Sequence, residues 1–459
     1  MQKKLTWLCA LCLLTGCQQS SMPDVDGVKQ QLDIPASWQH AQSAAQPLPS
    51  GQQAWWTTFN DPQLNKLVAA LLARNNNLAA AVYRLHEAQL NAGLADSQLL
   101  PDVAAGLDGT VGKQVNTGQP SRRAYSGSLS LRYELDIWQK IAASRDMAHW
   151  EATATGFDLA AARLKLTGSA LELYWRQQYL LERLQLEQRN ADSLARLQQI
   201  ASVRFRLGEG SRLEVLQAEQ DQLWQQQQQT QLRYLQQENL RALAILFNQP
   251  PGAPLPCTIA PADKLMFTPL TAPLPASILA RRPDLQAAEY RLRRKLTNIG
   301  VTQQSFYPTL VLNSSLSSGG GRDLMKVLHD PIGTVGGAIL FPFVHFNEMR
   351  LKTRVAEMQY SQSIALFKDA FYTALKEVED ALASRQRYYE EQLSLQHSAA
   401  MAERTLALAE LAWQTGQLSL KEVLTQRQAL ARQQQQLAEN RMNRNLAEMK
   451  LWLAIGGGS

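Results

Sequence analysis

Two long stretches of the chain carry small or apolar residues at a spacing that alternates between three and four positions. A spacing that averages 3.5 residues is the period of a coiled-coil seam, the stripe along which one helix packs on another. In the second stretch, only Arg385 and Gln392 are polar among the seam positions Phe371, Ala374, Val378, Ala381, Arg385, Tyr388, Gln392, Leu395, Ala399, Ala402, Leu406, Ala409 and Trp413. The pattern predicts a helix of unusual length.

The same seam occurs 208 positions earlier in the chain. Nine of the thirteen positions are apolar there, in the series Arg163, Leu166, Ala170, Leu173, Gln177, Leu180, Leu184, Glu187, Ala191, Leu194, Gln198, Ala201 and Phe205. A helix from about residue 141 to residue 207 would be ~100 Å long at a rise of 1.5 Å per residue. Such a helix does not fit a compact globular domain, but it fits a solvated spacer or the wall of a long tube.

Each predicted long helix ends at a matching break. The first break contains Gly208 and Ser211, and the second contains Gly416 and Ser419. A glycine at the end of a helix supplies the left-handed cap, and a serine caps the start of the next helix. A second, Gln-rich helix is predicted to run back from each break, so that each half of the chain holds a long helical hairpin.

Strict alternation of apolar and polar residues precedes each long helix and predicts β-strands. The clearest segment is 127–137, and the others are 103–111, Thr309–Leu316 and Thr334–Phe343. Such alternation suits a membrane strand with apolar side chains toward lipid and polar ones toward a lumen, although a half-buried hairpin of a soluble domain has the same period. Four strands do not close a barrel, and open edges are not tolerated in lipid, so several chains would have to pool membrane strands.

The chain is internally duplicated. The stretch Leu72–Pro101 recurs as Leu279–Pro308 with twelve of 30 positions identical, where unrelated sequences would share roughly two. The copied unit is longer than a solenoid repeat. We therefore predict a first repeat over 61–249, a proline-rich surface connector over 250–275 and a second repeat over 276–459.

The N-terminus predicts an export signal. Lys3 and Lys4 are followed by the apolar run Leu5–Leu14, which is too short to span a bilayer and is typical of a signal peptide. The run ends in Leu-Thr-Gly-Cys17, which resembles the bacterial lipobox and implies removal of residues 1–16 and acylation of Cys17. The alternative is an ordinary signal peptide with an unmodified cysteine. The resemblance further implies that residues 17–60 are an extended, lipid-anchored segment and that Gln18 after the cysteine permits sorting to the outer membrane.

Composition and motifs argue against other functions. Loss of residues 1–16 removes two lysines and no acids, so the net charge falls from +6 to +4, and no basic run interleaved with aromatics predicts binding to nucleic acid. Beyond Cys17 only Cys257 remains, so no internal disulfide is predicted. The six histidines lack metal-ligand spacing, and no residue has the setting of a nucleophile. We predict no enzyme, metal site or cofactor. The glycines at 319–321 are interpreted as a turn between strands.

Several motifs, in this order, resemble those of a TolC-like outer-membrane factor, and more narrowly the lipoprotein branch of outer-membrane efflux channels. They are the lipobox, the tryptophan-rich run from Trp55 to Leu64, Glu134–Trp138, Leu279–Leu285, Leu340–Phe343 and Ala454–Gly458. The resemblance implies a fold that is mainly α with membrane β. Three chains with four strands each would form a 12-stranded β-barrel, and six helical hairpins would form a coiled-coil tunnel in the periplasm.

The resemblance also implies function and partners. Members of this family act as homotrimers in the outer membrane, in contact with its lipid, and extend into the periplasm. They export drugs, metal ions or other small solutes with a periplasmic adaptor protein and an inner-membrane pump. Adaptor contact is implied at the hairpin tips, at Gly208, Ser211, Leu213, Gly416 and Ser419. The alternatives are a lipid-anchored coiled-coil scaffold or adhesin without a pore, and an outer channel for type I secretion.

One departure from the family pattern concerns the periplasmic aperture. Family members often narrow this end with acidic side chains on the returning helix of the second half. The matching positions here are Lys421 and Thr425, with Glu422 adjacent. We predict a less acidic aperture in which Lys421, repeated three times, disfavours cations. The alternative is that Lys421 is a solvated tip residue with little effect.

Overall fold

A computed structural model describes residues 22–35, 38–39, 54–113, 120–261, 276–321, 331–342 and 346–457. Contacts divide the chain into two compact units. The first comprises Met1–Asp33, Ala88–Ala154 and Ala288–Lys368, and the second comprises Ile34–Glu87, Thr155–Ala287 and Asp369–Ser459. Each unit takes segments from both sequence repeats. The repeat boundaries at 61–249 and 276–459 remain an interpretation of the sequence, and Cys17 lies outside the described residues.

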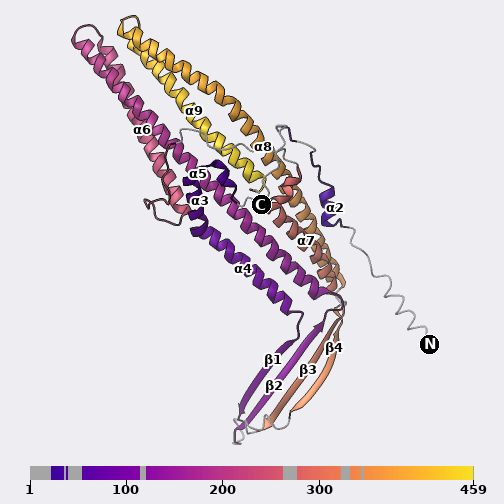
Figure 1. Cartoon of the computed structure of the whole chain (residues 1–459). Helices are drawn as coiled ribbons and strands as arrows, with labels where there is room; N and C mark the ends of the chain where they lie inside the picture. Colours follow the sequence, from indigo (N-terminus) through magenta and orange to yellow (C-terminus); the bar gives the residue numbers. More distant parts are fainter. Residues whose placement is uncertain are drawn as a thin grey trace. The chain divides into compact units, whose positions relative to one another are not determined.

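The first unit contains a four-stranded antiparallel sheet in the order β1-β2-β3-β4 (Figure 1). Its strands are β1 (Asp102–Gly112), β2 (Arg122–Leu135), β3 (Thr309–Gly321) and β4 (Ile332–Leu340). The central pair joins β2 of the first repeat to β3 of the second. The two sequence copies therefore form one sheet, with unpaired edges at β1 and β4.

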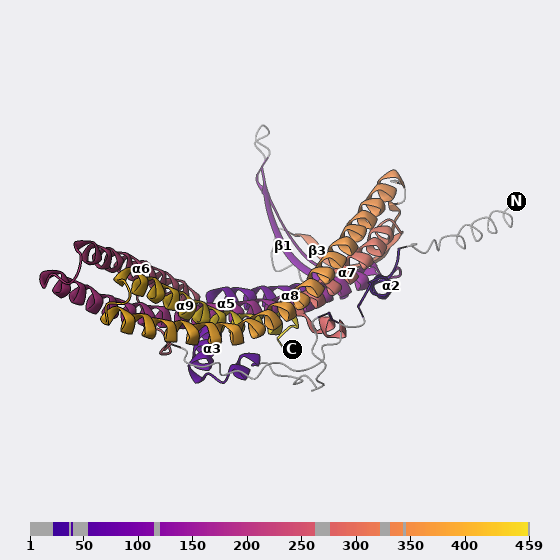
Figure 2. The same cartoon turned by 90° about the horizontal axis from the view of Figure 1, so that it is seen from above.

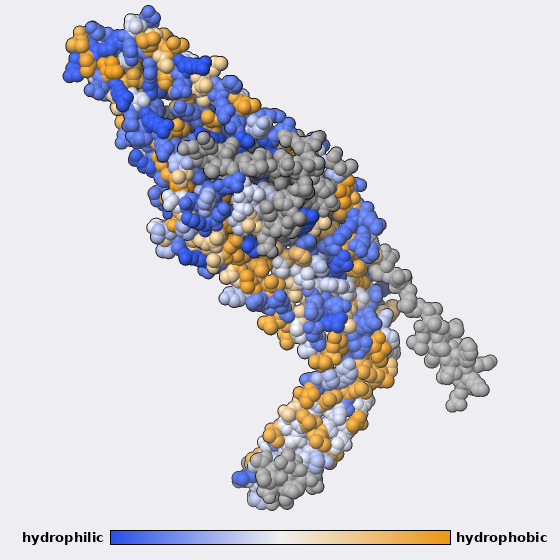
Figure 3. Space-filling view, in the orientation of Figure 1, coloured by the Kyte–Doolittle hydropathy of each residue, from blue (hydrophilic) through white to orange (hydrophobic). Residues whose placement is uncertain are grey.

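The register of the sheet places apolar residues on a common face. Leu131 of β2 lies opposite Val103 of β1, and Leu129 lies opposite Leu316 of β3. Because side chains alternate between faces, these pairings align the apolar sets of neighbouring strands. Leu107 is 81% exposed on that face, and hydrophobic residues are visible along the strands in Figure 3. The predicted alternation is confirmed.

The strand ends differ from the predicted ones for local reasons. β2 stops at Leu135 because the next residue, Asp136, caps the following helix, where its Oδ1 accepts from the Ile141 backbone N–H at 2.9 Å. β4 stops at Leu340, two residues before Pro342, which has no N–H for a sheet ladder. Phe343, predicted as the strand end, lies outside the described residues.

The interpretation of the glycines at 319–321 as a turn is wrong, because they belong to β3. At Gly319 an added Cβ would lie 3.0 Å from Cβ of Ser126. The pairing of β2 with β3 shifts register between Tyr125 and Ser126. Glycine permits this close approach of the two backbones, which is its usual role beside a bulge.

The helices confirm the predicted hairpins. The long helices are α5 (Lys140–Arg206, 67 residues) and α8 (Phe346–Gln414, 69 residues), and the returning helices are α6 (Arg212–Leu246) and α9 (Leu420–Ala454). In the second unit α6 and α9 lie side by side (Figures 1 and 2). The shorter elements are α2 (Val25–Gln30), η1 (Trp55–Phe59), α3 (Pro62–Arg74), α4 (Asn76–Ser97), η2 (Ala276–Arg281) and α7 (Pro283–Gln304). Among the described helices, none combines the length and hydrophobicity needed to cross a bilayer.

The predicted seams are largely confirmed. All thirteen positions of the second seam are buried or half-buried, as are eleven of the thirteen in the first. The exceptions are Arg163 and Phe205, the two ends of the first series. The 3.5-residue period therefore located the packed stripe, and it failed only at the two ends of the first series.

Aromatic packing within the second unit explains the tryptophan-rich motif. Trp55 stacks on Trp452 with ring centroids 6.2 Å apart, and Phe59 lies 4.7 Å from Trp175. Asp61 caps α3 and also accepts a hydrogen bond from the Tyr174 hydroxyl at 2.7 Å. The motif thus packs the segment before α3 against α5 and α9, and its role is structural.

Candidate functional site at the hairpin tips

Both hairpin tips use the same backbone turn. Gly208 and Gly416 have φ values of 78° and 79°. In the second tip the Gly416 N–H donates to the Trp413 carbonyl at 3.0 Å, and the next N–H donates to Ala412 at 2.8 Å. The first tip has the equivalent pair of bonds. This is the Schellman arrangement, which favours glycine because L side chains are strained at positive φ. The predicted glycine caps are confirmed.

The serines begin the returning helices, as predicted. The Ser211 hydroxyl accepts from the Glu214 N–H at 3.2 Å. Ser419 forms a full capping box with Glu422, whose carboxylate accepts from the Ser419 N–H at 3.0 Å. The hydrogen bond from the Ser419 hydroxyl lowers the pKa of Glu422. The Glu422 carboxylate thus accepts its hydrogen bonds from Ser419 at the start of α9.

The candidate aperture residues lie on the first turns of α9. Lys421 and Thr425 are both exposed, and the Thr425 hydroxyl donates to the Lys421 carbonyl at 2.9 Å. The equivalent of Lys421 in the first repeat is Leu213, which is 63% exposed. The two tips therefore share their backbone geometry and differ in side-chain chemistry at this position.

A hydrophobic cluster lies directly behind the tips and includes all four hairpin helices. Its buried members are Leu194, Leu197, Ala201, Val215, Ala218, Leu406, Ala409, Trp413, Leu420, Val423 and Leu424. The Arg204 guanidinium lies 5.4 Å from the centre of the Trp413 ring and donates to the Trp413 carbonyl at 3.4 Å. The two tips are consequently held together by apolar burial and by the cation–π contact and hydrogen bond of Arg204.

A buried carboxylate connects the two hairpins at a level further from the tips than the hydrophobic cluster. Glu187 of α5 is 2% exposed. Its Oε1 accepts from Gln435 of α9 at 2.8 Å, and its Oε2 accepts from Gln225 of α6 at 2.6 Å. Arg183, one turn earlier, lies 3.3 Å away. One carboxylate thus connects three helices, and its charge is compensated by an arginine and two amides.

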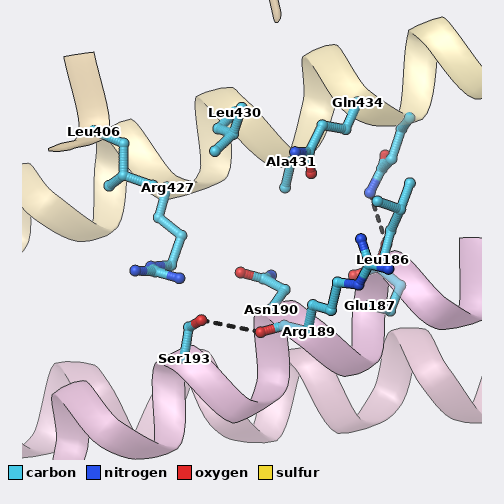
Figure 4. A pocket seen from close by; sticks show the side chains of 11 residues that line it. Leu186, Glu187, Arg189, Asn190, Ser193, Leu406, Arg427, Leu430, Ala431 and Gln434 are labelled. Atoms are coloured by element: carbon cyan, nitrogen blue, oxygen red, sulfur yellow. Dashed lines mark hydrogen bonds between the residues drawn. The ribbon is translucent and has the colours of Figure 1, made fainter. Parts of the chain in front are cut away.

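A cavity of about 160 Å³, lined by both polar and apolar side chains, adjoins this junction. Figure 4 shows Arg427 of α9 reaching toward Asn190 and Ser193 of α5 across the space between the helices. Arg427 also pairs with Glu410 of α8. A cavity of this size has room for water beside its polar side chains. Sequence reasoning missed this junction; its one signal was Glu187, the only acidic residue among the thirteen positions of the first seam.

The described residues contain no group of three or more His, Cys, Asp or Glu side chains placed to hold a metal ion. Cys257 is half-buried, and burial raises the pKa of its thiol to about 11. A thiol with a raised pKa is a weak nucleophile at neutral pH.

Comparison with known proteins gives consistent matches. Residues 67–249 and 274–457 match the family described as outer membrane efflux protein. The chain is 30% identical over 442 residues to the pyoverdine export outer membrane protein OpmQ of Pseudomonas putida, which covers 92% of each chain. It is 25% identical over 465 residues to the probable outer membrane lipoprotein SilC of Salmonella typhimurium, covering 99% of this chain and 98% of SilC.

The fold also matches a solved structure. The open state of the MtrE outer membrane channel of Neisseria gonorrhoeae superposes with a TM-score of 0.84 at 23% identity. The match covers 93% of this chain and 96% of that one. At this identity the likeness concerns the fold, and it includes both the sheet and the helical hairpins.

Proposed function

The chain belongs to the outer membrane efflux protein family, and we propose that it forms the outer duct of a tripartite pump with a periplasmic adaptor and an inner-membrane transporter. The predicted fold class is confirmed: duplicated helical hairpins with four strands per chain, the fold of trimeric channels in which three chains supply twelve strands. The predicted outer-membrane location and efflux function are confirmed by the family. The family and fold are those of channel proteins, and we propose no catalytic role.

The sheet is the observation that carries the proposal. Its aligned apolar face is exposed, and its two edges, β1 and β4, are unpaired within one chain. In lipid every backbone polar group needs a partner, so a four-stranded open sheet becomes stable only when other copies complete it. In a closed barrel of three copies, each edge pairs with a neighbouring chain and the apolar face meets lipid. The alternative of a scaffold without a pore does not explain a sheet with an exposed apolar face and unpaired edges.

Reconstitution tests the proposal. The purified chain is expected to migrate as a heat-modifiable trimer and to conduct ions in planar bilayers. Expression in a strain that lacks its own efflux channel, together with a matching adaptor and pump, is expected to restore resistance to small toxic solutes. A monomeric product without conductance would favour the alternative of a lipid-anchored scaffold.

In this proposal the inner-membrane pump, rather than the outer duct, determines which substrates are exported. Relatives of similar identity carry names that specify pyoverdine export and cation efflux, so one duct architecture serves different cargoes. We therefore propose export of small solutes without a dedicated substrate site. Secretion of a folded or unfolded polypeptide by a type I system is the alternative, and restored export of a peptide toxin in place of small solutes would support it.

The hairpin tips are the proposed contact with the adaptor. Gly208, Ser211, Gly416 and Ser419 supply the turns and caps, and Leu213 presents an exposed apolar side chain. A neighbouring apolar residue, Leu207, is 70% exposed. Photo-crosslinking from position 213 is expected to capture the adaptor, and crosslinking from exposed Lys376, many turns before the tip along α8, is the control.

Two further proposals concern Cys17 and the aperture. We propose that Cys17 is acylated, which adds about 0.8 kcal/mol of membrane affinity per buried CH₂. Mass spectrometry of the mature chain tests this, and an unmodified cysteine contradicts it. We also propose that Lys421, with Thr425 and Glu422, lines the periplasmic aperture; its test is given in the Discussion.

A further inference from the structure

The strands carry one charged residue on the apolar face of the sheet, and that residue is a cation. The pairing of β1 with β2 is uninterrupted from Asp102 to Gly112 and sets Val111 opposite Arg123. Because side chains alternate between the two faces, Arg123 lies on the same face as Leu131, eight positions along β2. Arg123 is exposed, and Val111 beside it is 69% exposed. A positive charge therefore ends the apolar face.

The other charged residues of the four strands lie on the opposite face. They are Asp102, Asp108, Arg122, Arg132 and Glu134, each an odd number of positions from an apolar-face residue of its own strand. That face mixes both signs of charge, as expected of a surface that meets water in a lumen. Arg123 stands apart because it has no acidic strand residue on its own face.

Arg123 lies at the end of the sheet that is remote from the helices. β2 begins at Arg122 and ends at Leu135, where the chain continues toward α5 (Figure 1). Ten Cα–Cα steps separate Leu135 from Tyr125, which is about 33 Å along an extended strand. A strand tilt of about 40° reduces this to about 25 Å along the membrane normal, the height of the apolar band of an outer-membrane barrel. Arg123 therefore lies just beyond this band, at the level of lipid headgroups.

Tyr125 marks the edge of the band independently. It lies opposite Gly109 of β1, and a Cβ added at Gly109 would lie 3.3 Å from Cδ1 and Cε1 of the tyrosine ring. The ring thus covers β1 at a glycine. Tyr133 lies on the same face near the other end of β2, opposite Leu312. Aromatic residues of this kind mark both membrane interfaces of a barrel, so Arg123 lies outside the aromatic girdle.

A second cation follows the neighbouring strand. Lys113 comes directly after β1, two positions beyond Val111, and is exposed. Continuation of the alternation past Gly112 makes Lys113 the diagonal neighbour of Arg123, a relation in which Cα atoms lie about 7–8 Å apart. Side chains of this length can bind one group together. A guanidinium binds phosphate through two parallel N–H groups, and an ammonium adds a point charge.

We infer that Arg123, together with Lys113, binds the phosphate of an anionic lipid in the outward-facing leaflet of the outer membrane. The inference rests on the membrane sheet of the proposed duct: the helices extend into the periplasm, so the opposite end of the sheet faces outward. An anionic headgroup fits because the two cations adjoin the apolar face that contacts the acyl chains. Three copies of the chain carry three such sites around the barrel.

Native mass spectrometry of the intact trimer measures this binding. The probes are dioleoyl phosphatidic acid and dioleoyl phosphatidylcholine, which share their acyl chains and differ in net charge. Arg123→Gln is expected to weaken binding of phosphatidic acid about fivefold, the effect of one basic residue near an anionic lipid surface. Lys113→Gln is expected to weaken it by a similar factor, and Arg123→Lys by less. Binding of phosphatidylcholine is expected to be unchanged in all three variants.

The matched control is Arg122→Gln, which removes the same charge from the adjacent residue on the opposite face. It is expected to bind phosphatidic acid as wild type does. Inorganic phosphate, added as a competitor, is expected to displace little of the lipid, because it does not contact the apolar face. The heat stability of each trimer verifies folding.

Three results overturn the inference. The first is an unchanged affinity of Arg123→Gln for phosphatidic acid. The second is an equal loss in Arg122→Gln, which would show attraction to net charge rather than a site on the apolar face. The third is complete displacement of the lipid by inorganic phosphate, which would make the ligand a free ion. A wild-type trimer that does not conduct contradicts the proposed duct instead, because none of these readouts uses conductance.

Discussion

Glu187 of α5 accepts a hydrogen bond from Gln435 of α9 at 2.8 Å, so a buried carboxylate of the first hairpin is bonded to the second hairpin. The position equivalent to Glu187 in the second repeat is Leu395. The junction therefore breaks the internal symmetry of the chain. A second contact between the same helices, from Glu182 to Arg441, lies nearby.

Removal of the Glu187 carboxylate is expected to destabilise the hairpins strongly. Glu187→Ala removes the carboxylate that accepts from buried Gln225 and from half-buried Arg183 and Gln435, and leaving such donors without this acceptor typically costs about 1–3 kcal/mol. Glu187→Gln keeps the shape and part of the hydrogen bonding and is expected to cost less. Apparent melting temperature of the purified protein measures the difference, with exposed Glu403→Ala as the control. Equal melting of Glu187→Ala and wild type would show that the junction contributes nothing.

Replacement by alanine is predicted to have opposite effects on stability at Gly416, which follows α8, and at Gly93, which lies within α4. Gly416→Ala places a Cβ at a φ of 79°, which is expected to cost about 1–2 kcal/mol. Gly93→Ala lies within α4, where an added Cβ meets nothing within 4 Å, and is expected to stabilise by about 0.5–1 kcal/mol. Hydrogen exchange of the tip amides and thermal unfolding measure both. A stabilising Gly416→Ala contradicts the assigned cap.

Acid sensitivity is predicted around Arg282 in the second unit. The Arg282 guanidinium contacts Asp284 at 2.7 Å and Glu377 at 2.6 Å. Burial opposes ionisation of Asp284, but the hydrogen bonds from Arg282 outweigh it and hold the pKa of Asp284 below its usual 3.8. The depressed pKa stabilises the fold above about pH 4, and this stabilisation is lost as pH falls through the lower folded-state pKa.

Asp284→Asn is therefore expected to lower stability at pH 7 and to lose less of it between pH 4 and pH 2. The difference is at most about 1 kcal/mol, because the Asp284 side chain is half-exposed and the pair is screened. Asp380→Asn, which removes an exposed pair with Lys376, is the control. Thermal unfolding as a function of pH measures both, and parallel curves for Asp284→Asn and wild type exclude the assigned role.

Charge at the aperture is predicted to depend on Lys421. Three copies of a lysine near a narrow pore raise the local potential and disfavour cations. Lys421→Ala is expected to increase cation preference, and Lys421→Glu is expected to increase it further. Single-channel reversal potentials in a salt gradient measure this, with Lys376→Ala as the control at an exposed position away from the tip. An unchanged preference in both variants would leave Lys421 as a solvated tip residue.

The sequence by itself determined the local elements. The 3.5-residue seams, the glycine and serine pairs at 208/211 and 416/419, and the alternation around Leu129 each depend on neighbours within a few positions. Periodicity and capping act at that range, so the hairpins and strands were predictable.

Tertiary structure decided which distant groups meet. The pairing of Leu129 with Leu316, the partners of Glu187 and the docking of Pro23 on Tyr360 join residues more than thirty positions apart. No local period encodes such contacts, because each depends on the packing of separate helices and strands. Residues 22–33 left no sequence signal of their docking, and only contacts such as that of Pro23 with Tyr360 show where they pack.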